Sequence, residues 1–258
     1  TYCINRSERF YNLYRDKAMA AFDWIKRVRA STPIVAPECY EGLFPPRRGC
    51  DWDQVFQAWM STDIFNVEFL CVFADAAEKF GDERAAEVRA EAEDYKNYMK
   101  KYMAEFAKKY EGSDILRVPL CPSGDDEKLI KGFYPYFGFG RFTANQIVSD
   151  EDVDRILNYI KVEGIKGEKG LYGHMPYPDG NMHIWYTTNS DYDWFLTFKR
   201  LGRRTEAEDI VRCQIAYSMT DEYYMLERYA DNDPYYVPWS PNASGNGRLL
   251  NMLLDLAE

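Results

Sequence analysis

The sequence predicts an all-α fold, an (α/α) toroid-like array of helical hairpins with short extended pieces in its loops. Three observations predict it. A helix that is apolar nearly all round precedes one with a single apolar face, the same order recurs later in the chain, and a glycine separates the two helices each time. Long aromatic-rich loops disfavour a regular solenoid, in which connections are short. The 258 residues are expected to form a single domain, 1–258, because no Gly/Ser linker divides them.

The first hairpin is predicted by the residues that follow Trp59. Residues 63–80 (DIFNVEFLCVFADAAEKF) are apolar on every side, which is typical of a covered helix. From Asp82 to Phe106, apolar residues recur at steps of three and four with charged residues between them, which indicates an amphipathic helix. We therefore expect residues 63–80 to form an inner helix that is more buried than an outer helix over 82–106.

The second hairpin is predicted over residues 191–219. The apolar segment DYDWFLTFKRLG, residues 191–202, precedes RRTEAEDIVRCQIAYSM, residues 203–219, whose polar positions are richer. An inner helix followed by an outer helix is again the expectation.

The joints and starts of the two hairpins are alike. FGDERAAE and LGRRTEAE place Gly81 and Gly202 as C-terminal stops of the inner helices. Trp59 and Trp185 are each followed by residues suited to an N-cap. The two tryptophans are therefore expected at equivalent N-terminal ends of the inner helices, on the same rim.

Further helices bring the expected number to about seven. They are predicted over residues 7–30, 150–164 and from about 245 onward. The Gly–apolar–aromatic tetrapeptides at 42–45, 132–135 and 170–173 are candidates for the short extended pieces.

Composition excludes several classes of partner. Forty-two acidic residues against 32 basic ones give a net charge of -10, which disfavours nucleic acid and anionic membrane surfaces. No apolar run approaches the ~20 residues of a membrane span, and the N-terminus lacks a signal-peptide pattern. A soluble protein is expected, either cytoplasmic or, with a signal absent from this chain, periplasmic or secreted. His174 and His183 are too few for a zinc site, so no metal and no organic cofactor are expected.

Aromatic residues make up 16% of the chain, and many lie in predicted loops. Such rings suit neutral sugars, whose C–H faces stack on them while hydroxyls reach polar neighbours. Core packing must account for at least half of them. The candidate substrate-binding residues are Trp52, Trp59, Tyr136, Trp185, Tyr186, Asp191 and Trp239. For Asp191, capping of the inner helix is the favoured alternative to sugar contact.

Three short motifs resemble a known family. Gly49-Cys50-Asp51, Glu227-Arg228-Tyr229 and Trp239-Ser240 are similar to motifs of the six-hairpin (α/α)6 toroid glycosidases, nearest the trehalase and mannosyl-oligosaccharide glucosidase branch. The resemblance spans about residues 40–258. It implies a glycoside hydrolase acting on a neutral oligosaccharide, with Asp51 as general acid and Glu227 as general base of an inverting reaction. About seven helices cannot close a twelve-helix ring, so the chain is expected to be the C-terminal part of a longer one or an incomplete ring.

The residue pattern keeps the assignment of the acid open. WDQVF follows the first motif where the family has Ser-Pro-Arg, so Asp53 competes with Asp51. The two carboxyls flank Trp52, which lets one raise the pKa of the other while the ring excludes water. The alternative is a turn or an N-cap.

Glu227 is expected at the end of a long helical run, where the helix dipole disfavours an acidic residue. It is predicted to share a pocket with Asp51 or Asp53, with Trp52 and Trp239 among the walls. Glu222 is the runner-up for the base.

Two further functions remain open at this stage. A sugar isomerase or epimerase on the same scaffold would use His174 and His183 as acid and base. A non-catalytic hairpin domain would bind a glycan or a partner on an aromatic face.

Overall fold

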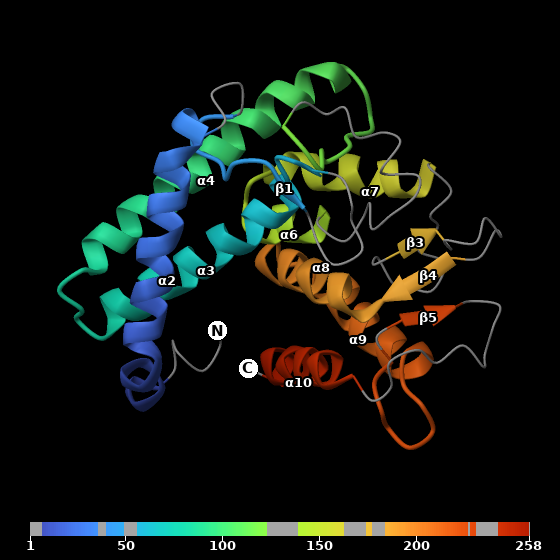
Figure 1. Cartoon of the computed structure of the whole chain (residues 1–258). Coiled ribbons are helices and arrows are strands. Elements are labelled where there is room, and N and C mark those ends of the chain that lie inside the picture. The colour runs from blue at the N-terminus through green and yellow to red at the C-terminus, as the bar shows by residue number, and fades with distance from the viewer. Residues whose placement is uncertain are drawn as a thin grey trace. The chain divides into compact units, whose positions relative to one another are not determined.

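The computed structural model describes residues 7–35, 40–48, 56–122, 139–162, 174–176, 184–226, 228–230 and 242–257. These residues are mostly helical, which confirms the all-α prediction at that level (Figure 1). They gather in two compact units, Thr1–Lys108 with Pro119–Gly124, and Lys109–Val118 with Asp125–Glu258. The toroid arrangement and the single domain over 1–258 stay predictions.

The first unit is a helical hairpin with a third helix and a small β-hairpin. Its elements are α2 (Glu8–Val35), β1 (Arg47–Arg48), β2 (Phe56–Gln57), α3 (Met60–Lys79) and α4 (Ala85–Ala107). The 3-10 turn η1 (Lys108–Tyr110) begins at the last residue of this segment and continues into the second unit. The extended pieces of this unit are therefore β1 and β2. In the tetrapeptide at 42–45, Gly42 and Leu43 belong to a turn that the N–H of Leu43 closes on the carbonyl of Tyr40 at 3.2 Å, and Phe44 and Pro45 are in no strand. The tetrapeptides at 132–135 and 170–173 lie outside the described residues.

The burial contrast between the inner and outer helix is confirmed. Within α3 the exposed residues are Phe65, Asp75, Glu78 and Lys79. In α4 the buried residues form one stripe of Val88, Ala92, Tyr95, Met99, Met103 and Phe106. The all-round apolar pattern thus marks the covered helix, and the one-faced pattern marks the helix that packs on it.

The corner between the two helices is a Schellman turn, and the second hairpin repeats it. Gly81 has φ 69° and Gly202 has φ 70°. The N–H of Gly81 donates to Glu78 at 3.3 Å and that of Asp82 to Ala77 at 2.8 Å. The same pair of bonds recurs at Gly202 and Arg203, at 3.1 Å and 2.8 Å. Glycine adopts this left-handed conformation without strain, so both predicted stops are confirmed.

The second unit contains the second hairpin, further short helices and a three-stranded sheet. Its elements are α6 (Phe139–Ala144), η2 (Asp150–Asp152), α7 (Val153–Val162), β3 (His174–Pro176), β4 (Ile184–Thr187), α8 (Thr188–Arg200), α9 (Arg204–Tyr217), β5 (Arg228–Ala230) and α10 (Ala243–Ala257). The sheet has the order β3-β4-β5 and is antiparallel.

The short helix α6 was not predicted. It packs on α8, where a Cβ on Gly140 would lie 3.0 Å from the Cβ of Asp193 and 3.0 Å from Cδ1 of Trp194. The hydroxyls of Thr143 and Thr197 share a hydrogen bond of 2.7 Å between the same helices. The sequence FGRFTA carries a glycine and weak helix formers, so the packing against α8 determines this helix rather than its propensity.

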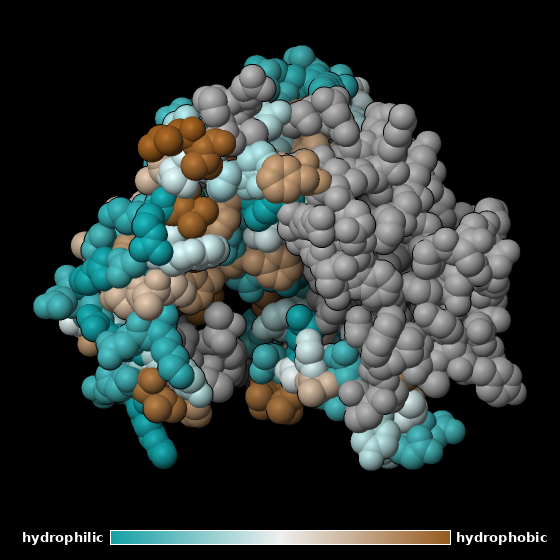
Figure 2. Space-filling view, in the orientation of Figure 1, coloured by the Kyte–Doolittle hydropathy of each residue, from teal (hydrophilic) through white to brown (hydrophobic). Residues whose placement is uncertain are grey.

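On the face shown in Figure 2, brown apolar side chains stand in small separate groups among polar ones. No helix in the described part of the chain is long and apolar enough to cross a membrane.

Candidate active site

Most residues predicted to form the site lie outside the described residues. These are Asp51, Trp52, Asp53, Tyr136, Glu227 and Trp239, and for Trp185 and Tyr186 the structure describes the backbone alone. The elements that flank these positions lie among the described residues.

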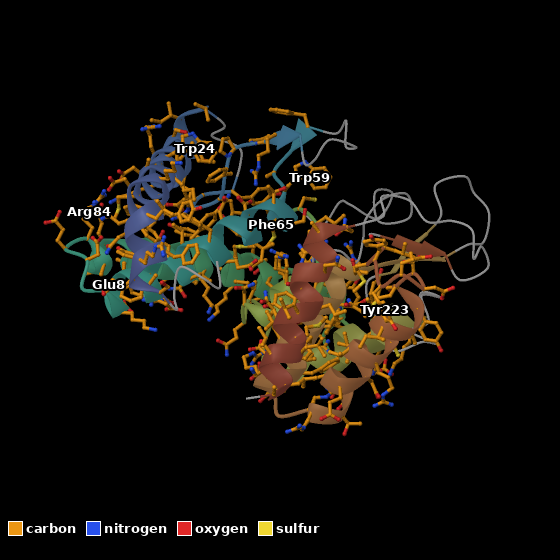
Figure 3. All side chains as sticks on the ribbon, turned by 90° about the horizontal axis from the view of Figure 1, so that it is seen from below. Glu8, Trp24, Trp59, Phe65, Arg84 and Tyr223 are labelled. Carbon is orange, nitrogen blue, oxygen red and sulfur yellow. The ribbon has the colours of Figure 1, made fainter. Side chains whose placement is uncertain are left out.

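The β1–β2 hairpin joins the two ends of residues 49–55, which include Asp51 and Asp53. Arg47 pairs with Gln57 and Arg48 with Phe56. The indole Nε1 of Trp59 donates to the carbonyl of Arg47 at 2.9 Å, and Nη2 of Arg47 donates to the carbonyl of Trp59 at 3.2 Å. These reciprocal bonds attach the hairpin to Trp59, the residue just before α3, which is labelled in Figure 3.

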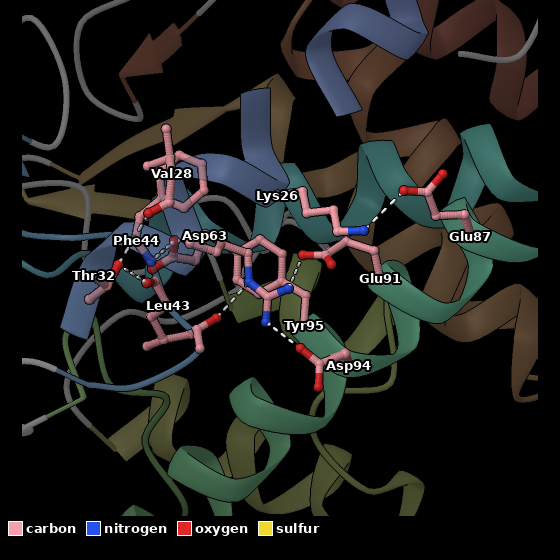
Figure 4. A network of polar contacts seen from close by, with 12 residues as sticks. Lys26, Val28, Thr32, Leu43, Phe44, Asp63, Glu87, Glu91, Asp94 and Tyr95 are labelled. Carbon is pink, nitrogen blue, oxygen red and sulfur yellow. Dashed lines mark hydrogen bonds and ion pairs between the residues drawn. The ribbon is translucent and has the colours of Figure 1, made fainter. Parts of the chain in front are cut away.

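A buried carboxylate completes this attachment. The side chain of Asp63, in the first turn of α3, is 0% exposed. Its Oδ1 accepts from the backbone N–H of Phe44 at 3.3 Å and from the hydroxyl of Tyr95 (Figure 4). The same oxygen accepts from Nη2 of Arg47 at 3.0 Å. Its Oδ2 is buried and has no hydrogen-bond partner among the described residues. We call Asp63, Arg47, Trp59 and Tyr95 the hairpin anchor.

Burial dominates the electrostatics of the hairpin anchor. Desolvation raises the pKa of Asp63, although Arg47 and the hydroxyl of Tyr95 act in the opposite direction. Desolvation, followed by the charge of Asp63, also raises the pKa of Tyr95 well above its usual value. Tyr95 is therefore a donor at physiological pH, so its bond to Asp63 is retained.

The side chain of Arg29 holds the turn that leads to β1. Arg29 is 5% exposed, and its Nε donates to the carbonyl of Gly42 at 2.7 Å. Its guanidinium lies 4.0 Å from the ring centroid of Tyr95 and forms ion pairs with Glu91 and Asp94. The outer helix α4 thus contacts Asp63 directly through Tyr95. It contacts the turn indirectly, because Glu91 and Asp94 pair with Arg29.

The start of α8 repeats part of this construction. Asp191 is 0% exposed and is the fourth residue of α8, as Asp63 is of α3. Nε2 of Gln214, on α9, lies 3.4 Å from Oδ2 of Asp191 and donates to the carbonyl of Thr188 at 3.2 Å. A carboxylate in the first turn is favoured by the helix dipole. The burial of Asp191 therefore supports the capping alternative over sugar contact.

The backbone on either side of Glu227 also lies at the start of α8. The hydroxyl of Thr188 donates to the carbonyl of Leu226 at 3.3 Å, and Arg228 pairs with Thr187. The segment that carries the candidate base is thus flanked by residues fixed against an inner helix.

The expectation that Glu227 ends a helical run is wrong. The outer helix α9 ends at Tyr217, and a bridge between Met219 and Met225 closes a turn before Leu226. Tyr223 in that turn has φ 66°, which interrupts any helix. The dipole argument for Glu227 therefore does not apply.

The two tryptophans do precede the inner helices. Trp59 comes directly before α3, and Trp185 lies in β4, which leads into α8. The ring of Trp59 is buried, so packing and its bond to Arg47 account for it. Their position on one rim stays a prediction.

Sequence reasoning missed Arg47, Tyr95 and Arg141. Arg141 forms a buried ion pair of 3.3 Å with Asp193 of α8. The one available signal was the repeated acidic residue in the first turn of each inner helix. The partners of these acidic residues come from other elements, so they leave no local pattern in the sequence.

Two findings bear on cofactors and on identity. No group of three or more His, Cys, Asp or Glu side chains among the described residues could hold a metal ion. No family model, curated protein or solved structure matches this chain. The fold defines a mainly helical protein of repeated αα-hairpins, and the resemblance to toroid glycosidases rests on the sequence motifs.

Proposed function

We propose that this protein is a glycoside hydrolase that acts on a neutral oligosaccharide by an inverting two-carboxylate mechanism. Asp51 or Asp53 is the general acid and Glu227 the general base. The supporting observation is that both candidate segments adjoin the start of an inner helix in their own unit. β1 and β2 flank the first segment beside α3, and Leu226 and Arg228 flank the second beside α8.

The chemistry follows from the two protonation states. The protonated acid gives its proton to the glycosidic oxygen as the bond to the anomeric carbon breaks. The ionised base takes a proton from a water molecule that attacks the same carbon from the opposite face, which inverts its configuration. Inverting enzymes hold the two carboxyls roughly 6.5–9.5 Å apart to admit that water.

A panel of neutral glycosides, with the product anomer identified by NMR, tests this function. Glu227→Gln should lower turnover by about 10²-fold or more, because general-base catalysis contributes ~10²–10⁴-fold. Glu222 is the runner-up for the base and is exposed, so Glu222→Gln tests that alternative and should retain activity if Glu227 is the base. Asp51→Asn and Asp53→Asn decide which residue is the acid. A retained anomer, or full activity in Glu227→Gln, would refute the mechanism.

A further inference from the structure

We propose that an exposed face of α2 is the interface through which the protein pairs with a second copy of itself. This inference is independent of the proposed hydrolase activity. α2 has 28 residues, which makes it about 42 Å long, and it lies across α3 and α4 (Figure 1). One face of α2 packs on these two helices, through contacts such as those of Tyr11 with Phe73 and of Arg29 with Tyr95.

A second apolar stripe runs along α2 beside the buried face. We call it the α2 stripe, and it consists of Phe10, Leu13, Tyr14, Lys17, Trp24 and Val28. At about 100° per residue, its centre lies about 110° round the helix from the centre of the buried face. Nine residues of α2 are charged, and Lys17 is the only one of them in the stripe. One apolar face of α2 is therefore buried within the first unit, and a second is left exposed.

The α2 stripe forms a continuous patch rather than scattered single residues. Leu13 is 64% exposed, and Phe10, Tyr14 and Trp24 are 42%, 46% and 48% exposed. The rings of Phe10 and Tyr14 stack with their centroids 6.4 Å apart, and Trp24 packs edge-on against the buried ring of Phe44. Since an aromatic side chain covers about 150–250 Å², these four side chains leave on the order of 400 Å² of apolar surface exposed. A contiguous patch of that size marks an interaction site.

The α2 stripe is complementary to itself when two copies cross antiparallel. Ala20 and Ala21 lie near its midpoint, where small side chains let two helices approach closely. With a two-fold axis between these alanines, Lys17 lies opposite the partner's Trp24. A cation over the face of an indole is stabilising, so the one charge in the stripe meets the ring best suited to it. Each such contact forms twice in a two-fold dimer.

Size and charge favour a second copy over a lipid surface. Together with Val35, which is 63% exposed on the same side of α2, the α2 stripe approaches the area of about 800 Å² that a standard interface buries on each partner. A helix that binds anionic lipid needs basic residues free to reach the headgroups. In α2, Arg15, Lys26 and Arg29 form ion pairs with acidic residues of α4 or of the corner before it. These three cations are therefore already neutralised within the first unit.

Sedimentation velocity of the whole chain, at about 1–100 µM, measures the pairing and should show a monomer–dimer equilibrium. Trp24→Ala should raise the dimer dissociation constant about 100-fold or more, because interfacial tryptophans dominate binding and the two-fold axis applies the change twice. Lys17→Glu should raise it about 10-fold, whereas Lys17→Arg keeps the cation and should leave it unchanged. Phe10→Ala should also weaken the dimer. Phe65→Ala is its matched control, since Phe65 lies on α3 and is 41% exposed.

Far-UV circular dichroism distinguishes a variant that has lost its partner from one that has lost its fold. An unchanged spectrum with a lost dimer in Trp24→Ala supports the interface. A monomer at every concentration, or a dimer that Trp24→Ala and Lys17→Glu leave intact, would overturn it. Binding of the monomer to phosphatidylserine vesicles, abolished by Trp24→Ala, would assign the α2 stripe to a membrane surface instead. These measurements require no turnover, so their outcome is separate from that of the hydrolase test.

Discussion

Replacing Gly42 with alanine should destabilise the protein much more than the same change at Gly81 or Gly202. All three glycines have left-handed backbones, with φ 79°, 69° and 70°. At Gly42 a Cβ would lie 2.2 Å from Cγ and Cδ2 of Tyr98, whereas at the other two nothing lies within 4 Å. The three sites therefore share the backbone strain and differ in the steric clash.

The expected magnitudes follow from these two terms. Left-handed strain costs about 1–2 kcal/mol, and the smaller entropy of the unfolded chain returns about 0.4–1 kcal/mol. Gly81→Ala and Gly202→Ala should therefore lower the unfolding free energy by about 1 kcal/mol. Gly42→Ala adds overpacking of about 1–3 kcal/mol, for a total of about 2–4 kcal/mol.

Urea denaturation, followed by circular dichroism, measures the three changes. Tyr98→Ala, which removes the ring, should make Gly42→Ala less costly in the double variant. Equal losses at all three glycines would refute the reasoning, because they would show that the ring moves aside freely.

Two further predictions concern single side chains. Arg15 holds the pKa of Asp82 well below its usual range, so the stability from Asp82 is present above about pH 4 and is lost as pH falls. Burial raises the pKa of Asp63, so its contribution is complete below about pH 4 and is lost as pH rises through the raised pKa. Urea denaturation from acid to neutral pH should therefore show opposite pH-dependent changes for Asp82→Asn and Asp63→Asn, and changes of the same sign would contradict the argument. Tyr223→Gly should raise the unfolding free energy by about 0.5–1 kcal/mol, because it relieves left-handed strain at a ring that is 79% exposed. A lower melting temperature for this variant would show that the ring contributes contacts after all.

The sequence predicted those parts of the fold that depend on local signals. Apolar periodicity located both helical hairpins, and a glycine followed by polar residues located both corners, because a Schellman turn needs only neighbouring residues. The ends of helices were less certain. α3 begins at Met60 rather than at Asp63, since the carbonyl of Trp59 accepts the N–H of Asp63 at 3.0 Å.

The hairpin anchor could not be predicted in the same way. Asp63 meets Arg47 and Tyr95, which are separated from it by 16 and 32 positions in the chain. Nothing in the local pattern distinguishes a capping aspartate from one that is bonded to residues of two other elements, β1 and α4. Such contacts depend on tertiary packing, which periodicity does not describe.

The two sheets differ in how much chain must be brought together before they form. β1 and β2 are separated by a short segment, so their pairing is a local event. β4 and β5 enclose the whole α8–α9 hairpin, and joining them involves the larger loss of chain entropy. Long-range pairings of this kind form late in folding. The strand that follows Glu227 is therefore expected to become ordered after α8 and α9 have packed, whereas the pairing around residues 49–55 requires only its immediate neighbours.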